Sequence, residues 1–359
     1  MGTIWCAISG HGFGHAAQIV PVLNELGRLV PGLSALLRTT VPASFFEDCL
    51  KIRWSLQAVK QDVGCVQHGP LDIDVAATWD AHEEFHTAWQ ARLEAEISEM
   101  RAVRPAVILA DTPYLAVSAG SEAGIPTVVT ANFTWHEILA SLERAGDQHE
   151  TLLQSIWDAY GKANIGLRIA PGLSLAGIPD VVDIGPIAEP AASEREHLRS
   201  HLGILASERL VLVGFGGIPL STLPWEHMEQ MRGYRFLIDG PPPPECSRVH
   251  SLSTLPWSFK TALASVDVVV TKPGYGTILE AVALGLPVVY VRRYNFADEA
   301  SLVEFLNAYG QGRELSREDF VSGHWREALE AVSAGRSGGE RPRLTGPADA
   351  AKFLRQYFQ

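Results

Sequence analysis

The sequence predicts an α/β protein of two Rossmann-like domains, each with a doubly wound parallel β-sheet, that face each other across a cleft. Short apolar runs alternate with helical patterns along the 359-residue chain. The runs lack the polar alternation of half-exposed strands, which indicates parallel strands that are covered on both faces. At about 150 residues per domain, the length also fits two domains with sizeable cores.

The predicted strands fall into two sets, one in each half of the chain. The first set comprises Thr3–Ser9, Leu33–Thr39, Ala106–Ala110, Thr127–Thr130 and Ile165–Ala170. The second comprises Leu210–Val213, Arg235–Ile238, Asp267–Thr271 and Pro287–Val291. Apolar residues at helical spacing, as at 19–26 and 278–283, place helices between the strands.

A Gly- and Pro-containing stretch at 185–192 marks the expected domain boundary, because Ser193 and Glu196 follow it as a capping box for a new helix. We therefore expect a first domain at 1–186 and a second at 187–344. A C-terminal segment, 345–359, is expected to form a helix over about 348–357 that packs back on the first domain. The cleft between two such domains is the expected place for a ligand.

Composition excludes several classes of function. The charge is 29 − 41 = −12, which argues against a general nucleic-acid binder. No apolar run approaches the ~20 residues of a membrane span, and the first residues read as a strand rather than a secretory signal. The cysteines form no CxxC pair, so we expect reduced thiols and a cytoplasmic protein; they are Cys6, Cys49, Cys65 and Cys246.

A glycine-rich loop with two histidines, Ser9–Ala16, follows the first strand. Glycines at such a turn let the backbone approach a ligand. Because imidazole titrates near neutrality, His15, or His11 in its place, is a candidate general base. Asp111 ends another strand and can orient that imidazole. The alternatives are turn histidines that satisfy local carbonyls and an Asp that caps a helix.

A second loop, Lys272–Thr277, ends the predicted strand Asp267–Thr271 and begins a helix. The N–H groups of Gly274, Tyr275, Gly276 and Thr277 suit a diphosphate. Lys272 adds positive charge, and Glu280 lies one turn on, where it can accept hydrogen bonds from ribose hydroxyls. The alternative is a tight turn with a solvated Glu.

Two further loops lie at the expected carboxyl edge of the second sheet. Gly216 and Gly217 form a weaker phosphate-type loop. Arg292 begins a polar loop in which Asp298 and Glu299 can bind sugar hydroxyls or simply begin a helix.

The sequence also contains an HExxH pattern, from His82 to His86. Helical spacing would place both histidines on one face, as in zinc proteases. However, no third histidine follows at metzincin spacing, and the acids at 94–99 lie on what reads as one continuous helix. We therefore expect a polar helix face and no metal site.

Taken together, these segments resemble the GT-B glycosyltransferases, including the UDP-glycosyltransferases and the peptidoglycan N-acetylglucosaminyltransferase. They are more similar to the glycosyltransferase-like N-terminal half of plant L-arabinokinase. One departure is Gln18, where the plant relative leads us to expect a basic residue. The shared stretches are Gly10–Ala16, Asn132–Trp135, Lys272–Thr277, Val291–Arg293 and Gly323–Trp325.

The resemblance implies an inverting, metal-independent glycosyltransferase that transfers a sugar from a nucleotide sugar, expected to be UDP-linked, to a hydroxyl of a small molecule or glycan. It needs no cofactor beyond this co-substrate. Trp257 or Phe259 is expected beside the nucleotide base. Alternatives are a sugar-nucleotide epimerase or hydrolase of the same fold and a non-catalytic nucleotide-sugar binder. Kinase activity is not implied, because the Ser-rich phosphate loop of the kinase half is missing.

Overall fold

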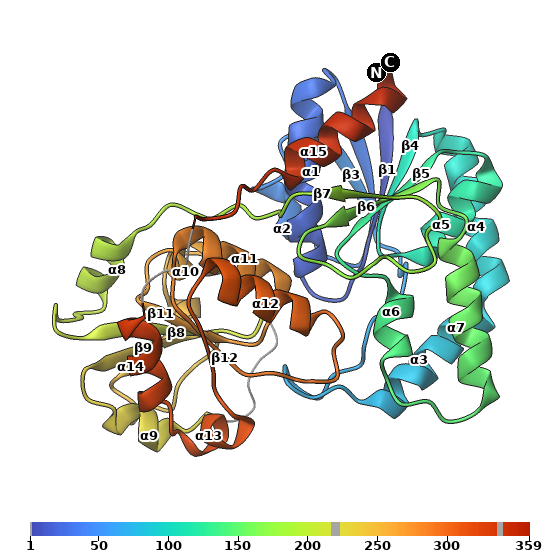
Figure 1. Cartoon of the computed structure of the whole chain (residues 1–359). Coiled ribbons are helices and arrows are strands. Elements are labelled where there is room, and N and C mark those ends of the chain that lie inside the picture. Colours follow the sequence, from blue (N-terminus) through green and yellow to red (C-terminus); the bar gives the residue numbers. More distant parts are fainter. Residues whose placement is uncertain (1, 217–222, 336–339) are drawn as a thin grey trace.

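The computed structural model describes residues 2–216, 223–335 and 340–359. It contains two parallel β-sheets, of seven and six strands, with helices on their faces (Figure 1). This confirms the predicted fold class of two doubly wound α/β units.

The first sheet has the strand order β3-β2-β1-β4-β5-β6-β7. Its order reverses between β1 and β4, which pair directly, with Ile8 opposite Asp111. Such a switch point is where ligands bind in open α/β sheets. The strands are β1 (Thr3–Ile8), β2 (Ser34–Arg38), β3 (Arg53–Gln57), β4 (Val107–Asp111), β5 (Thr127–Ala131), β6 (Ile165–Ile169) and β7 (Val181–Ile184).

The helices of this half are α1 (Gly14–Leu29), α2 (Ala43–Glu47), α3 (Val75–Thr87), α4 (Trp89–Val103), α5 (Tyr114–Ala123), α6 (Trp135–Ala140) and α7 (Asp147–Tyr160). The prediction of one continuous helix through the HExxH segment is wrong. The backbone leaves helical geometry at Ala88 (φ −105°, ψ 17°), so α3 ends and α4 begins there.

The second sheet has the order β10-β9-β8-β11-β12-β13, with its switch point between β8 and β11. The strands are β8 (Arg209–Val213), β9 (Tyr234–Ile238), β10 (Val249–Ser251), β11 (Val268–Thr271), β12 (Val288–Tyr290) and β13 (Gly312–Glu314). The helices of this half are α8 (Arg195–His201), α9 (Trp225–Gln230), α10 (Phe259–Leu263), α11 (Tyr275–Leu284), α12 (Glu299–Tyr309), α13 (Arg317–Ser322) and α14 (Arg326–Ala334). The last helix, α15 (Gly346–Leu354), packs on the first half. Single 3₁₀ turns are η1 (Leu252–Thr254) and η2 (Arg355–Phe358).

The chain passes between the two sheets twice, between β7 and α8 and again before α15, which lies along α1 of the first half (Figure 1). The proposed domain limits, 186/187 and 344/345, fall in these crossings. The backbone N–H of Gly346 donates to the Pro186 carbonyl at 3.2 Å, which joins them. The expected capping box at the first crossing does not form: α8 begins at Arg195, and the Ser193 hydroxyl accepts from the Arg195 N–H at 3.3 Å.

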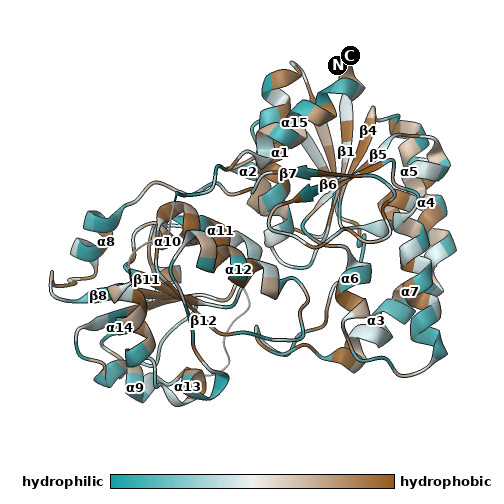
Figure 2. Cartoon of the chain, viewed as in Figure 1, coloured by the Kyte–Doolittle hydropathy of each residue, from teal (hydrophilic) through white to brown (hydrophobic). Residues whose placement is uncertain are grey.

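The strands of both sheets carry the apolar core, and the outer helix faces are polar (Figure 2). One apolar cluster is continuous between the halves, because α1, α11 and α15 all contribute to it. Across the described ranges, no helix combines the length and apolar character that a membrane crossing requires.

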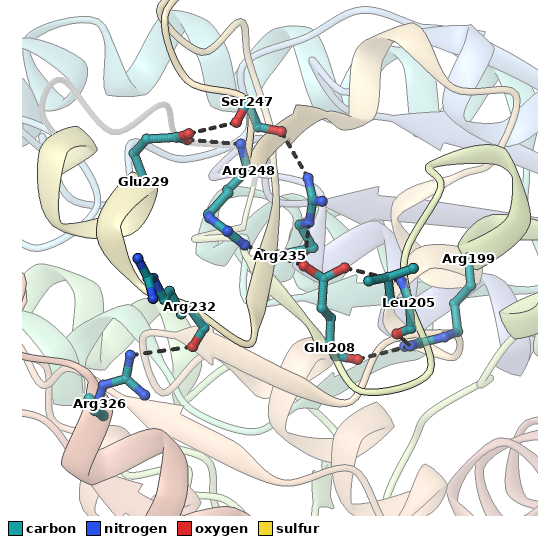
Figure 3. A network of polar contacts seen from close by, with 9 residues as sticks. All are labelled: Arg199, Leu205, Glu208, Glu229, Arg232, Arg235, Ser247, Arg248 and Arg326. Atoms are coloured by element: carbon teal, nitrogen blue, oxygen red, sulfur yellow. Dashed lines mark hydrogen bonds and ion pairs between the residues drawn. The ribbon is translucent and has the colours of Figure 1, made fainter.

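Polar contacts link the amino ends of strands in the second sheet, at the edge opposite the carboxyl ends where ligands are expected. Glu208, just before β8, accepts from Arg235 and Arg248, while Arg199 donates to the carbonyls of Leu205 and Glu208 (Figure 3). These charged side chains therefore stabilise the amino ends of the strands and take no part in the opposite, carboxyl edge of the sheet.

Candidate functional site

The carboxyl edge of the first sheet brings His15 and Asp111 together. His15 lies in the first turn of α1, which follows the glycine loop after β1, and Asp111 ends the neighbouring strand β4. Imidazole Nδ1 is 3.1 and 2.9 Å from the two carboxylate oxygens. Asp111 is fully buried, and the His15 side chain is 8% exposed. With Nδ1–H donating to Asp111, Nε2 is left as the proton acceptor.

Three carboxylates set the ionisation of His15. Burial alone would lower its pKa, but the charge and hydrogen bond of Asp111, with the charges of Asp62 and Asp298, raise the pKa above its usual value. The imidazole is thus a stronger base than free histidine. It can act as one only at a pH where it has lost its extra proton.

Asp62, which the sequence analysis missed, is buried beside this pair. It accepts hydrogen bonds from the Ser9 hydroxyl at 3.0 Å and from the indole N–H of Trp135 at 2.7 Å. Burial raises its pKa to about 6 despite these donors. It comes from the loop between β3 and α3, which carries no motif that would have singled it out.

His11 lies higher in the glycine loop, edge-on to the Trp135 ring at 5.3 Å. Burial, together with the nearby charges of His15, Lys272 and Arg293, lowers its pKa to about 3. Its ring presses so closely on Gly64 that a Cβ there would lie 2.5 Å from Nδ1. His11 therefore stays neutral near pH 7, packed against Trp135 and Gly64 of the first half.

In the second half, Lys272 follows β11 directly. Burial and the charge of Arg293 together lower its pKa to about 7, although the charges of Glu299 and Asp298 oppose this. Gly216 lies beside it, since a Cβ on Gly216 would be 3.9 Å from Lys272 Cε. Gly217 lies outside the described residues. The structure thus places the first glycine of the weaker loop next to the predicted phosphate cation.

The first turn of α11 is open where the diphosphate is predicted. Gly274 caps the helix in an extended conformation without a side-chain cap. A Cβ on Gly276 would meet nothing within 4 Å, so the backbone here is approachable. Thr277 completes this turn and is half-buried. The Tyr275 side chain, in contrast, ties the halves together: its hydroxyl donates to the Ala170 carbonyl at 2.8 Å and accepts from the Ile187 N–H at 3.0 Å.

Glu280, on the next turn of α11, is buried and paired. Its carboxylate lies 2.8 Å from the Lys260 ammonium, which partly offsets the rise in the pKa of Glu280 that burial causes. Phe259, next to Lys260, packs on the backbone of Gly214 at the end of β8. Trp257 lies edge-on to His201 at 5.5 Å. Trp257 and Phe259, the residues predicted to lie beside the nucleotide base, thus come from the same segment as Lys260, the partner of Glu280.

The two predicted sugar-binding acids, Asp298 and Glu299, have different hydrogen-bond partners although they are neighbours in sequence. Glu299 is fully buried, and its two oxygens accept from the Arg293 backbone N–H at 3.0 Å and from Arg293 Nε at 2.6 Å. Arg292 lies over the Tyr294 ring at 4.6 Å. Asp298, in contrast, is turned to the first half, where Asn132 Nδ2 donates to it at 3.4 Å. Burial raises the pKa of Asp298 to about 7.

The HExxH histidines are occupied by protein groups. His82 Nε2 is 2.9 Å from the Gly64 carbonyl, and His86 Nε2 is 3.2 Å from the Tyr114 hydroxyl. Among the residues that the structure describes, no group of three or more His, Cys, Asp or Glu side chains is placed to hold a metal ion.

Each half inserts an apolar side chain into the core of the other. Phe296, from the loop before α12, is buried in the core of the first half, edge-on to Phe133 at 5.9 Å. Leu71, from the loop before α3, is buried in the core of the second half, and Arg317 donates to its carbonyl at 2.8 Å. Phe296 and Leu71 therefore hold the two halves against each other.

Comparison with solved structures identifies this architecture. The calicheamicin glycosyltransferase CalG4 superposes with a TM-score of 0.65, at 20% identity, over 99% of this chain and 98% of that one. The fold is that of the GT-B glycosyltransferases. Phytolacca americana UGT2, solved with UDP-2-fluoro-glucose and pterostilbene, shares this GT-B fold with a TM-score of 0.63, at 15% identity, over 100% and 94% of the two chains.

In sequence, the GT-B chain is similar to L-arabinokinase from Arabidopsis thaliana, with 29% identity over 340 residues. The match covers 91% of this chain and 32% of the relative, so the chain spans about a third of that protein's length. No family model matches.

Proposed function

We propose that the chain is an inverting, metal-independent glycosyltransferase that transfers a sugar from a UDP-sugar to a hydroxyl acceptor. One observation carries this proposal: a buried His15–Asp111 pair lies at the carboxyl edge of the first sheet, and at the same edge Asn132 of the first half donates to Asp298 of the second half. The charges of His15 and of Lys272, one in each half, both lower the pKa of His11. UDP is proposed because the neighbour of the same fold was solved with a UDP-sugar analogue.

In the proposed reaction, His15 Nε2 takes the proton of the acceptor hydroxyl while Asp111 holds Nδ1–H. The acceptor oxygen forms a bond to the anomeric carbon, and the bond from that carbon to the diphosphate oxygen breaks with its electron pair. Attack from the face opposite the leaving group inverts the configuration at that carbon.

The departing diphosphate is stabilised by the free N–H groups of the first turn of α11 and by Lys272. The pKa of Lys272 near 7 in the free protein should rise when a diphosphate supplies negative charge beside it. Positive charge on the protein then takes the place of a metal ion. We also propose that the protein works in the cytoplasm, where its four free cysteines stay reduced.

Binding of UDP through Glu280 tests the nucleotide site. To accept from ribose hydroxyls, the carboxylate has to share or release Lys260, which is 39% exposed and can move into solvent. Calorimetry should give a UDP affinity about tenfold lower for Glu280→Gln than for wild type, since a hydrogen bond to a charged group contributes about 1.5–3 kcal/mol.

Glu304→Gln, at an exposed position on α12, is the matched control and should bind UDP like wild type. Equal affinity in Glu280→Gln and wild type would remove Glu280 from the site. Tighter binding of ADP than of UDP would support the nucleotide site but show that its nucleobase is adenine rather than uracil.

A hydrolase or epimerase of the same fold is the second candidate, and the enclosure of His15 favours it. A side chain that is 8% exposed is reached more easily by water than by a large acceptor. Stoichiometric release of UDP and free sugar, or of a new UDP-sugar, without any acceptor would support this alternative.

A further inference from the structure

The HExxH segment of α3 forms a row of hydrogen bonds that ends on the loop carrying Asp62. The Gly64 carbonyl only accepts hydrogen bonds, so His82 Nε2, 2.9 Å away, carries the proton between them. Burial lowers the pKa of His82 to about 4, so the ring is neutral near pH 7 and Nδ1 is an acceptor. The Tyr114 hydroxyl donates to Nδ1 at 3.4 Å and accepts from His86 Nε2 at 3.2 Å. These bonds fix the orientation of His82 and anchor Gly64.

Asp62, in this anchored loop, joins three segments that surround His15. Its Oδ1 accepts from the Ser9 hydroxyl at 3.0 Å, and its Oδ2 accepts from the Trp135 indole at 2.7 Å. The Thr112 hydroxyl lies 3.5 Å from Oδ2, at the limit of hydrogen-bond distance. The Trp135 ring is itself 6.0 Å from the His15 ring. One buried carboxylate therefore connects the segments that follow β1, β4 and β5.

The turn behind the orienting carboxylate is strained at the same place. Thr112 directly follows Asp111 and has φ +60°, a conformation that β-branched residues rarely adopt. The Tyr160 hydroxyl donates to the Thr112 carbonyl, and Asp62 faces the Thr112 hydroxyl. Such strain persists only where the surroundings hold the backbone, and it is concentrated at functional sites. The contacts of Asp62 therefore help to set where Asp111 points.

Hydrogen bonding alone does not require a charge at Asp62. An amide at this position can accept from the Trp135 indole and donate its NH₂ group to the Ser9 hydroxyl, which accepts as well as donates. Burial of the carboxylate is costly, and this burial raises the pKa of Asp62 to about 6. A costly buried charge points to an electrostatic task, and the charge of Asp62 acts on the His15 imidazole.

We propose that Asp62 is a positioning residue for His15, and that His82 of the HExxH segment holds Asp62 in place through Gly64. Asp62 keeps the segments after β1, β4 and β5 around the imidazole and presents a negative charge to it. The inference rests on the proposed function, in which His15 is the base. It gives the HExxH segment a role in the site that needs no metal ion.

Titration of the His15 imidazole by NMR, in the full chain with labelled histidine, tests the proposal without any substrate. The His15 signal is assigned by its absence in His15→Gln. In Asp62→Asn its midpoint should fall by about one pH unit, because a neighbouring negative charge is lost. Asp111 and Asp298 still face the imidazole in this variant, so part of the effect of the carboxylates remains. Asp80→Asn, at an exposed position on α3, is the matched control and should leave the midpoint unchanged.

Two variants of His82 test the anchor. His82→Leu removes the hydrogen bond to the Gly64 carbonyl and releases the loop of Asp62, so the His15 midpoint should fall in the same direction. His82→Gln carries an amide N–H in place of Nε2 and should keep the midpoint of wild type. Rescue by glutamine separates positioning from a general loss of packing, and circular dichroism shows that each variant is folded.

The outcomes separate this inference from the proposed function. An unchanged His15 midpoint in Asp62→Asn would overturn the proposal, even if the protein turns over a UDP-sugar. A shift in Asp62→Asn with the wild-type midpoint in His82→Leu would overturn the role of His82. The predicted shifts in a protein that neither binds nor turns over any UDP-sugar would support the positioning network and overturn the transferase alone.

Discussion

Single carboxylates at this site are buried at a cost to the free protein. Burial raises the pKa of Asp62 to about 6 and that of Asp298 to about 7, both from an ordinary value of 3.8. Because the folded state holds these protons more tightly than the unfolded state, each group stabilises the fold below about pH 4. That contribution is lost as the pH rises through the folded-state pKa.

The isosteric change Asp298→Asn should therefore raise the thermal stability of the ligand-free protein at pH 8. The expected gain is at least about 1 kcal/mol, since one pKa unit corresponds to about 1.4 kcal/mol. At pH 5, where Asp298 is mostly protonated in the fold, the gain should be smaller than at pH 8. Thermal melts of both proteins at the two pH values measure it. A loss of stability at pH 8 would show that Asp298 is already well solvated or paired.

Residue identities at the site could be predicted only where topology dictates them. His15 and Asp111 lie at the carboxyl ends of adjacent parallel strands, which meet at one edge of the sheet. The sequence therefore predicted that the two side chains are close together, and they are in contact in the structure. Asp62 lies beside them through long-range packing of the loop between β3 and α3, which no local pattern encodes. For the same reason, the burial of Glu299 under Arg293 had no signal in the sequence.

At the scale of elements, the central strands and the helices that follow them were predictable, because continuous apolar runs mark strands that are buried on both faces. The strands that escaped prediction lie at or near sheet edges. Residues of β3 alternate between exposed and half-buried, and Val181 to Asp183 of β7 are exposed. Strands β10 and β13 are three residues long, too short for any periodicity to show.

The break between α3 and α4 escaped prediction for a related reason. Ala88 is a strong helix former, and nothing nearby signals a stop. Tertiary packing decides it: His86 and Trp89, on either side of the break, stack at 4.9 Å, and both rings pack on Tyr114. Packing of this kind overrides local propensity.

At the scale of the whole molecule, the site exists only while the halves stay together. Leu71 belongs to a loop of the first half but is buried in the core of the second, and Phe296 makes the reverse crossing. The shared cluster of α1, α11 and α15 closes a third side. We therefore expect limited separation of the halves in the free protein.

Leu71→Ala should lower the free energy of unfolding by about 2–5 kcal/mol, as for other buried leucines, although its loop lies outside both sheets. Chemical denaturation followed by circular dichroism measures this. Leu205→Ala, at a position that is 63% exposed, is the matched control and should change stability by less than about 0.5 kcal/mol. Equal stability of the two variants would mean that the crossing at Leu71 contributes nothing to the hold between the halves.

The central claim, that His15 is the base that Asp111 orients, is tested most directly by turnover of a UDP-sugar with an acceptor found by screening. His15→Ala should cut turnover by roughly 10² to 10⁴, with UDP affinity unchanged because UDP is bound by the other half. Asp111→Asn should act in the same direction and move the rise of activity with pH to a lower pH, since the charge of Asp111 raises the pKa of His15. Near-normal turnover in His15→Ala, with UDP binding intact, would contradict the account.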